Sequence, residues 1–286
     1  MRWTARGRSK NLEDRRAGGM SRGAMIGGGG GIIGIIVVLL SQFLGGPAGD
    51  VVGGLTRAPP PSNAPAGPLE TTPAEEKLVD FVSWALDDIQ TTWQTEFKQR
   101  NRTYREANLV LFRDRVDSAC GMQGAAVGPF YCPADFKAYI DLGFYQMLHE
   151  RFKAPGDFAQ AYVLAHEIGH HVQNLLGTST RIQRLKQDNP RLANDLSVRL
   201  ELQADCYAGV WAHFTNKRGH LEMGDREEGL RAAASIGDDA LQKGAGQAVR
   251  PDTFTHGTSE QRQRWFDTGF KSGREEECDT FVARTL

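Results

Sequence analysis

The stretch AHEIGHH, residues 165–171, decides the fold and the chemistry expected of this 286-residue chain. His166 and His170 are four residues apart, so on a helix their rings project from one face and can share a tetrahedral metal. Glu167 can reach a metal-activated water without binding the metal. This pattern is typical of a zinc hydrolase, in which zinc lowers the pKa of the water, the glutamate takes its proton and the hydroxide attacks a carbonyl.

Two histidines do not hold a catalytic zinc, because a third protein ligand is needed. His171 is rotated away from the pair, so we expect it at the surface or behind the ligands. One class of enzymes has a glycine and a histidine three and six residues after the second ligand. The chain has Gln173 and Leu176 at those places, and that class is excluded.

The segment ELQAD, residues 201–205, offers another source of the third ligand. Glu201 and Asp205 share one face of a helix, so the first can bind zinc while the second accepts an N–H from a ligand histidine. Taken alone, two such carboxylates are typical of a solvent-exposed helix face. Because they follow an H-E-x-x-H helix, we predict Glu201 as the third metal ligand and Asp205 behind it.

Four segments together resemble the neutral zinc metallopeptidase family: HEIGHHVQ, ELQADCYAG, GPFYCPADFKAYIDLGF and FTHGTSEQRQRWFDTGF. The resemblance runs from about residue 74 to the end. It implies a gluzincin-type zinc peptidase, with Zn²⁺ as the cofactor and a peptide or protein as the substrate. The family's bacterial members carry a short basic amino terminus and one hydrophobic segment ahead of this domain.

The segment THGTSEQR, residues 255–262, is similar to the T-H-P-x-x-x-x-R segment of membrane-integral gluzincins such as the CAAX prenyl endopeptidases. By that analogy His256 lies near the zinc, gating it or steadying the oxyanion, and Arg262 pairs with a nearby carboxylate. The chain departs from the pattern at Gly257, where a proline is expected. The alternative for His256 is a loop residue that caps a helix.

Apolar periodicity predicts an α+β fold, a mainly helical zincin-like domain with a small β-sheet over residues 74–286. We expect helices over residues 74–100, 157–177, 190–214, 225–241 and 259–270. Short strands are expected at NLVLF, PFYCP and KAYIDLGF. The last two precede the zinc helix, where zincins have an edge strand that binds an extended peptide.

The uncharged segment MIGGGGGIIGIIVVLLSQFLGG, residues 25–46, predicts one transmembrane helix, because about 20 residues cross a hydrocarbon core. Seven basic residues precede this segment, whereas Arg57 is the only basic residue in the roughly thirty residues that follow it. The positive-inside rule therefore predicts a cytoplasmic segment over residues 1–24 and a catalytic domain in the periplasm or outside the cell. A cleaved signal peptide and a buried core helix are the alternatives.

Residues 47–73 are rich in Pro, Gly, Ala and Ser and read as a flexible linker. Such a linker would allow the domain to bind proteins of the cell envelope, whose identity the sequence does not give. A net charge of −1 gives no basic face of the kind that nucleic acids need, so we expect no nucleic-acid partner.

The four cysteines suggest two disulfides in a translocated domain. Cys120 and Cys132 bracket a short loop and form the natural local pair, which leaves Cys206 with Cys278. Four reduced, buried thiols are the alternative.

A second function class also fits the sequence: a membrane-anchored envelope scaffold or binding module with a structural zinc. Structural zinc sites are closed by four protein ligands, so a fourth ligand such as His256, His213 or His220 would favour it. A structural site has no need of Glu167, and this favours the peptidase.

Overall fold

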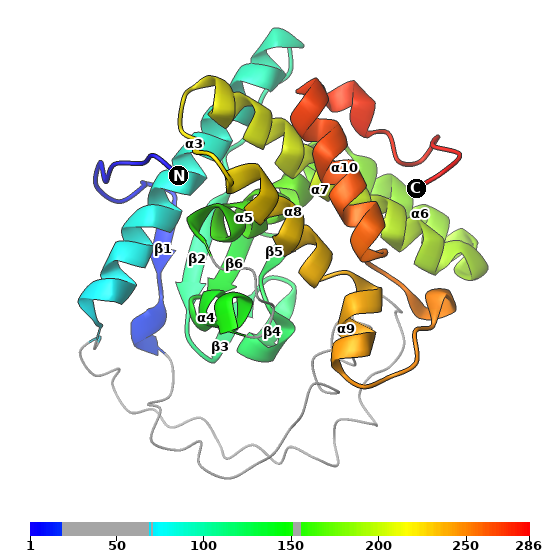
Figure 1. Ribbon diagram of the computed structural model, residues 1–286, viewed down its shortest axis with the longest axis horizontal. Helices are drawn as coiled ribbons and strands as arrows, with labels where there is room; N and C mark the ends of the chain where they lie inside the picture. The colour runs from blue at the N-terminus through cyan, green and yellow to red at the C-terminus, as the bar shows by residue number, and fades with distance from the viewer. Residues whose placement is uncertain (19–68, 70, 151–155) are drawn as a thin grey trace.

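The computed structural model describes residues 1–18, 69, 71–150 and 156–286, and in these ranges a helical body lies against a small sheet (Figure 1). The strands are β1 (Leu12–Asp14), β2 (Asn108–Phe112), β3 (Arg115–Ser118), β4 (Gly121–Gly124), β5 (Phe130–Cys132) and β6 (Lys137–Asp141). The helices are α3 (Pro73–Gln99), α4 (Gly143–Glu150), α5 (Asp157–Leu175), α6 (Thr178–Asp188), α7 (Ala193–Lys217), α8 (Asp225–Ser235), α9 (Asp238–Gly244) and α10 (Ser259–Ser272). Short 3-10 helices η1 (Arg16–Gly18), η3 (Ala125–Val127), η4 (Pro190–Leu192), η5 (Pro251–Thr253) and η6 (Glu275–Cys278) join them.

The main sheet has the strand order β1-β2-β6-β5. Strands β1, β2 and β6 are parallel, and β5 runs antiparallel to β6 at the edge next to the zinc-motif helix α5. The central strands β2 and β6 are almost fully buried, as expected of parallel strands covered on both faces. Strands β3 and β4 form a separate antiparallel hairpin.

Helices α5, α7 and α10 form the centre of the helical body (Figure 1). Helices α7 and α10 touch through their backbones at two glycines. A Cβ atom on Gly209 would overlap the carbonyl oxygen of Phe266, and one on Gly269 would overlap that of Cys206. The close approach of these two helices therefore depends on glycine at both positions.

A buried carboxylate ties the long helix α3 to α7. Asp88 accepts hydrogen bonds from the indole of Trp211 at 2.8 Å and the hydroxyl of Thr215 at 2.6 Å. Arg218 completes this network with an ion pair at 2.8 Å. Because every polar atom in the network is paired, the carboxylate can be buried at a modest cost in free energy.

The predicted helical and sheet segments largely match the structure. The first helix, the strand NLVLF, the zinc-motif helix and the final helix begin and end within two residues of their predicted bounds. The segment predicted as one helix over residues 225–241 is instead divided into α8 and α9 at Gly237, where a Cβ atom would overlap Ser259. Strand β1, the β3–β4 hairpin and helices α4 and α6 were not predicted.

Both disulfides are present with the expected pairing. Cys120 is joined to Cys132 and Cys206 to Cys278, with Cα–Cα distances of 5.9 and 5.5 Å. The first joins the β3–β4 hairpin to the edge strand β5, and the second fastens η6 to α7. The alternative of four reduced thiols is thereby removed.

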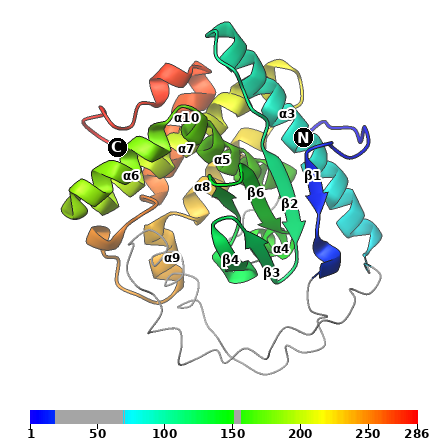
Figure 2. The same ribbon diagram turned by 180° about the vertical axis from the view of Figure 1, so that it is seen from behind.

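The amino-terminal residues belong to the same folded body as the helices. Strand β1 pairs in parallel with β2, with Leu12 opposite Leu109 (Figure 2). The buried guanidinium of Arg16 binds the carboxylates of Glu75 and Glu76 at the start of α3. The amino group of Met1 lies 2.9 Å from Asp157 at the start of α5.

The predicted single-pass membrane topology is corrected here. Residues 25–46 lie outside the described residues, and within the described ranges no helix is both long and apolar enough to cross a membrane. A single crossing after residue 18 would also put β1 and β2 on opposite sides of the bilayer, yet the two strands pair. The transmembrane helix, the membrane partner, the cytoplasmic segment and the periplasmic or extracellular domain are therefore withdrawn as predictions.

Candidate metal centre

The two helices that carry the predicted ligands pack closely at a glycine within the zinc motif. A Cβ atom on Gly169 would lie 2.9 Å from the carbonyl oxygen of Ala204 and 3.1 Å from its Cα. Because only hydrogen fits at this position, α5 and α7 approach closely enough for their side chains to meet across the interface.

Three predicted ligands meet at this crossing. Nε2 of His166 lies 3.1 Å from Oε2 of Glu201, and Nε2 of His170 lies 3.5 Å from its Oε1. One donor atom from each residue falls within 4.8 Å of the other two. His166 and Glu201 are buried, whereas His170 is partly exposed.

Each histidine is held so that Nε2 faces the group. His166 donates from Nδ1 to Oδ1 of Asp205 at 2.8 Å. His170 donates from Nδ1 to Oε1 of Gln173 at 2.9 Å, and Gln173 donates from Nε2 to the carbonyl of Leu200 at 2.7 Å. That second bond fixes the orientation of the amide, so its oxygen faces the histidine. Because Nδ1 is engaged in both rings, Nε2 is the nitrogen that would bind a metal once it has lost its proton.

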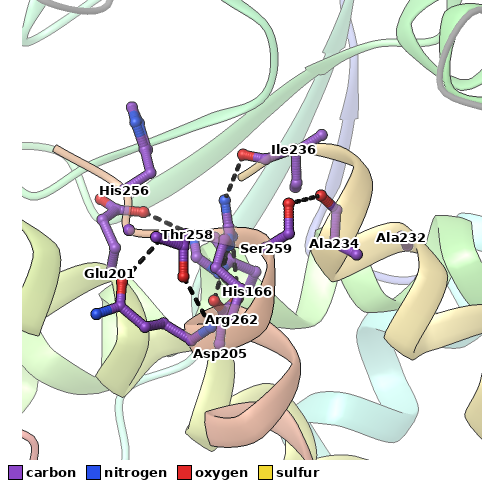
Figure 3. A network of polar contacts seen from close by, with 12 residues as sticks. His166, Glu201, Asp205, Ala232, Ala234, Ile236, His256, Thr258, Ser259 and Arg262 are labelled. Atoms are coloured by element: carbon purple, nitrogen blue, oxygen red, sulfur yellow. Dashed lines mark hydrogen bonds and ion pairs between the residues drawn. The ribbon is translucent and has the colours of Figure 1, made fainter. Parts of the chain in front are cut away.

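Asp205 sits in a buried network that joins α5, α7 and α10 (Figure 3). Arg262 donates to it from Nε at 2.8 Å and from Nη2 at 3.0 Å, and Tyr162 donates from its hydroxyl at 2.5 Å. Arg262 also donates to the carbonyl of Ile236 at the end of α8. Burial would raise the pKa of Asp205, but Arg262 and His166 together outweigh it and lower the pKa. Asp205 is therefore ionised and holds Nδ1–H of His166, which turns Nε2 toward Glu201.

The electrostatics of the donor group suit a divalent cation. Burial alone would raise the pKa of Glu201, but His170 and His166 outweigh it and hold the pKa well below its usual range. Burial likewise opposes the charge on His166, yet Asp205 and Glu201 raise its pKa to about 10. Two imidazoles facing an ionised carboxylate form the N, N, O donor set of catalytic zinc sites, so the residues fit zinc.

Glu167 lies beside the donor group but outside it. Its side chain is only 7% exposed, its carboxylate oxygens are not among the fully buried atoms, and none of the described residues hydrogen-bonds to them. Burial raises its pKa, the effect that the two histidines oppose. The carboxylate borders a cavity of about 640 Å³ that His166, His170 and Glu201 also line.

His256 borders the same cavity. Asp238, at the start of α9, accepts from its backbone N–H at 2.7 Å and lies 3.2 Å from its Nδ1. Asp238 also accepts from the N–H groups of Thr255 and Gly257, so one carboxylate fixes the whole turn. The residue that caps α10 is Thr258, which removes the capping alternative for His256.

His171 is fully buried, which corrects the expectation that it could lie at the surface. Its Nε2 donates to the carbonyl of Arg105 at 2.6 Å, and its Nδ1 accepts from the hydroxyl of Tyr131 at 2.9 Å. Asn174 donates to the same hydroxyl at 3.0 Å. The edge strand β5 is thus tied to the zinc-motif helix by a pair of side chains from that helix.

Sequence reasoning did not identify Gln173, Tyr162 and Asp238 as supports of the centre. Gln173 follows His170 by three residues, and Tyr162 precedes His166 by four, so the helical spacing carried a signal for both. Asp238 had no such signal, because its contact with His256 closes a loop between separate elements. His213 and His220 hydrogen-bond to the carbonyls of Phe270 and Arg2, and no fourth donor joins the group among the described residues.

Comparisons with known proteins identify the family of the chain. The family model described as "Putative neutral zinc metallopeptidase" matches residues 1–281. The uncharacterized protein YpfJ of Escherichia coli (strain K12) is 45% identical over 284 residues, which cover 98% of this chain and 99% of that protein. The uncharacterized protein Rv2575 of Mycobacterium tuberculosis (strain ATCC 25618 / H37Rv) is 43% identical over 194 residues, which cover 64% of this chain and 65% of that protein. No solved structure matches the chain significantly.

Proposed function

The chain belongs to the neutral zinc metallopeptidase family, and from this we propose that it is a zinc-dependent peptidase with Glu167 as general base. One observation carries the proposal. Glu167 is buried next to the donor group, contributes nothing to it, and turns its carboxylate to the cavity. Holding a carboxylate in a largely buried position with no hydrogen-bond partner among the described residues costs free energy, and such groups are concentrated at catalytic sites.

His166, His170 and Glu201 would hold the metal. When bound there, zinc would acidify a water molecule and polarise the carbonyl of the scissile bond. The remaining steps belong to side chains of this chain. Glu167 takes a proton from the attacking water and delivers it to the departing amine, a role for which its raised pKa is suited.

His256 is the second catalytic residue in this proposal. Its Nδ1 is engaged by Asp238, so Nε2 is the nitrogen left to donate to the oxygen of the scissile carbonyl. Asp205 and Arg262 act behind the ligands, where they keep Nε2 of His166 toward the metal. The edge strand β5, antiparallel to β6 and bordering the cavity, suits an extended peptide that pairs with its backbone.

The competing proposal, a binding module with a structural zinc, has less support. A structural site needs four protein ligands, and the described residues offer three. It also gives no reason to bury Glu167.

The decisive experiment is Glu167→Gln, assayed on an unfolded protein substrate together with metal analysis. We expect hydrolysis to fall by at least about 100-fold, because a general base contributes roughly 10² to 10⁴ to the rate. Zinc content should be unchanged. In contrast, Glu201→Gln should lower the zinc content as well as the rate.

The matched control is Glu260→Gln, since Glu260 is exposed at the start of α10. It should behave like the unchanged protein in both measurements. Full activity in Glu167→Gln would eliminate the mechanism. A stable zinc complex with no hydrolysis of any substrate by the unchanged protein would favour the structural-zinc alternative.

A further inference from the structure

We propose that this site selects extended peptide segments with a bulky apolar side chain beside the scissile bond, and that it rejects lysine and arginine there. The inference rests on the proposed peptidase function and extends it to a class of substrate. It is carried by the walls of the cavity, by their charges and by the way the edge strand is held.

The cavity extends from the donor group between β5, α4 and the ends of α8 and α9. Its volume of about 640 Å³ lies within the range of sites that enclose a ligand of several side-chain groups. Away from the donor group, its walls are mainly apolar: Val127, Phe130, Phe144, Met147, Val163 and Ile236. A side chain that enters this space loses its water, so only an apolar one gains free energy by doing so.

The charged side chains that line the cavity disfavour a basic substrate side chain. Outside the centre itself, the charged side chains among the described lining residues are Arg184 and Lys186, both on α6. The two lining carboxylates, Glu167 and Glu201, belong to the centre and face its histidines. A substrate lysine or arginine would therefore be desolvated, and the described lining residues outside the centre would offer it two positive charges and no carboxylate.

The edge strand that would align the peptide is rigidly held. The ring of Phe130 stacks on Tyr139 with centroids 4.7 Å apart. Tyr131 is bound by His171 and Asn174 from α5, and Cys132 is bonded to Cys120. Because β5 is fixed to the helix that carries the ligands, a peptide pairing with it would bring alternate side chains to a defined wall of the cavity.

The expected preference for an apolar side chain also indicates which proteins the site would cleave. Leucine, phenylalanine and methionine are mostly buried in folded proteins. Segments that are extended and offer such side chains are therefore those of unfolded or locally unfolded chains.

The test uses the zinc-loaded protein and internally quenched peptides that differ at one residue, placed on either side of the cleaved bond. For one of the two positions, we expect kcat/KM for leucine and phenylalanine to exceed that for alanine by about 10-fold or more. Lysine at that position should be at least about 100-fold worse than leucine. Equal cleavage of the leucine and lysine peptides would overturn the inference.

A charge-introducing variant tests the wall directly. Met147→Glu puts a carboxylate in the apolar wall, so the ratio of kcat/KM for leucine over lysine should fall by about 10-fold or more. The matched control is Met223→Glu, because Met223 is fully exposed and does not line the cavity. An unchanged ratio in a folded, zinc-loaded Met147→Glu protein would count against the proposal, and if that variant does not fold, the peptide series alone decides.

Failure of the inference and failure of the proposed function remain distinguishable. If no peptide is cleaved, or if cleavage continues unchanged in the presence of a zinc chelator, the proposed zinc peptidase function itself is wrong. If peptides are cleaved in a chelator-sensitive way without an apolar preference, only the substrate class is wrong.

Discussion

Asp205 shows how one residue can decide the chemistry of the centre without touching the metal. It is fully buried, and its two oxygens accept from Arg262, Tyr162 and His166. Taking a carboxylate and a guanidinium out of water is costly, so a buried pair of this kind is maintained only when the geometry satisfies both groups. The pair keeps His166 in the tautomer that a metal ligand needs.

The substitution Asp205→Asn tests this role. It leaves Arg262 buried without a charged partner, so we expect a loss of about 3 to 5 kcal/mol in the free energy of unfolding. Zinc affinity, measured by competition with a coloured chelator, should weaken by about 10- to 100-fold.

Asp252→Asn is the control, because among the described residues the side chain of Asp252 pairs with Arg250 alone, at the exposed surface. Its effect on stability should be within about 0.5 kcal/mol. Unaltered zinc affinity in a destabilised Asp205→Asn protein would assign Asp205 a purely structural role.

At the scale of elements, glycines set the distances between the helices that build the centre. Gly169 lets α5 approach α7, whereas Gly209 and Gly269 let α7 approach α10. The first contact brings the histidines to Glu201, and the second brings Arg262 to Asp205. The α5–α7 contact therefore positions the metal ligands, and the separate α7–α10 contact positions the Asp205–Arg262 pair behind them.

Gly269→Ala tests the second contact. The new Cβ atom would overlap the backbone carbonyl of Cys206, so α10 has to move away from α7. We expect a loss of about 1 to 3 kcal/mol in stability, measured by urea unfolding, together with weaker zinc binding because Arg262 moves with its helix.

Gly244→Ala provides the comparison, because nothing lies within 4 Å of the added atom. It should change stability by no more than about 0.5 kcal/mol. Equal effects of the two substitutions would show that the α7–α10 contact does not constrain the centre.

At the scale of the whole molecule, residues 1–18 complete the sheet and bind the starts of two helices. Glu13 in β1 accepts hydrogen bonds from Lys137 at 2.6 Å and from Asn108 at 2.9 Å. Burial would raise the pKa of Glu13, but Lys137, Arg15 and Asn108 outweigh it and lower the pKa to about 2. Residues 1–18 are therefore held against the sheet in part by the ionised carboxylate of Glu13.

The sign of the pH dependence follows from that shift. The pKa of Glu13 falls from its ordinary value of 4.5 to about 2 on folding, so its stabilisation is fully present above about pH 4.5 and is lost as the pH falls toward 2. The unchanged protein should be more stable than Glu13→Gln at pH 6, and the two should converge near pH 2. Thermal unfolding from pH 2 to 7 measures this, and a gap that widens on acidification would refute it.

The sequence by itself determined the elements whose pattern is local. Helical periodicity gave the bounds of α3, α5 and α10, and spacings of four residues paired His166 with His170 and Glu201 with Asp205. The helix bounds match the structure, and the paired residues share a helix face, because residues one helical turn apart lie on one face whatever surrounds the helix. The roles of these residues at the metal stay predictions. The same local reasoning gave a membrane topology that the described residues do not support, since none of their helices could cross a membrane and hydropathy takes no account of the pairing of β1 with β2.

Only the tertiary structure decided which distant residues meet. It buried His171 against Arg105 and Tyr131, brought Asp238 under His256 and joined Arg262 to Asp205. Each of these contacts joins separate elements, and its geometry depends on how those elements pack rather than on spacing along the chain. The apolar cavity beside the centre is of the same kind, because its walls come from several elements and exist only once the chain has folded.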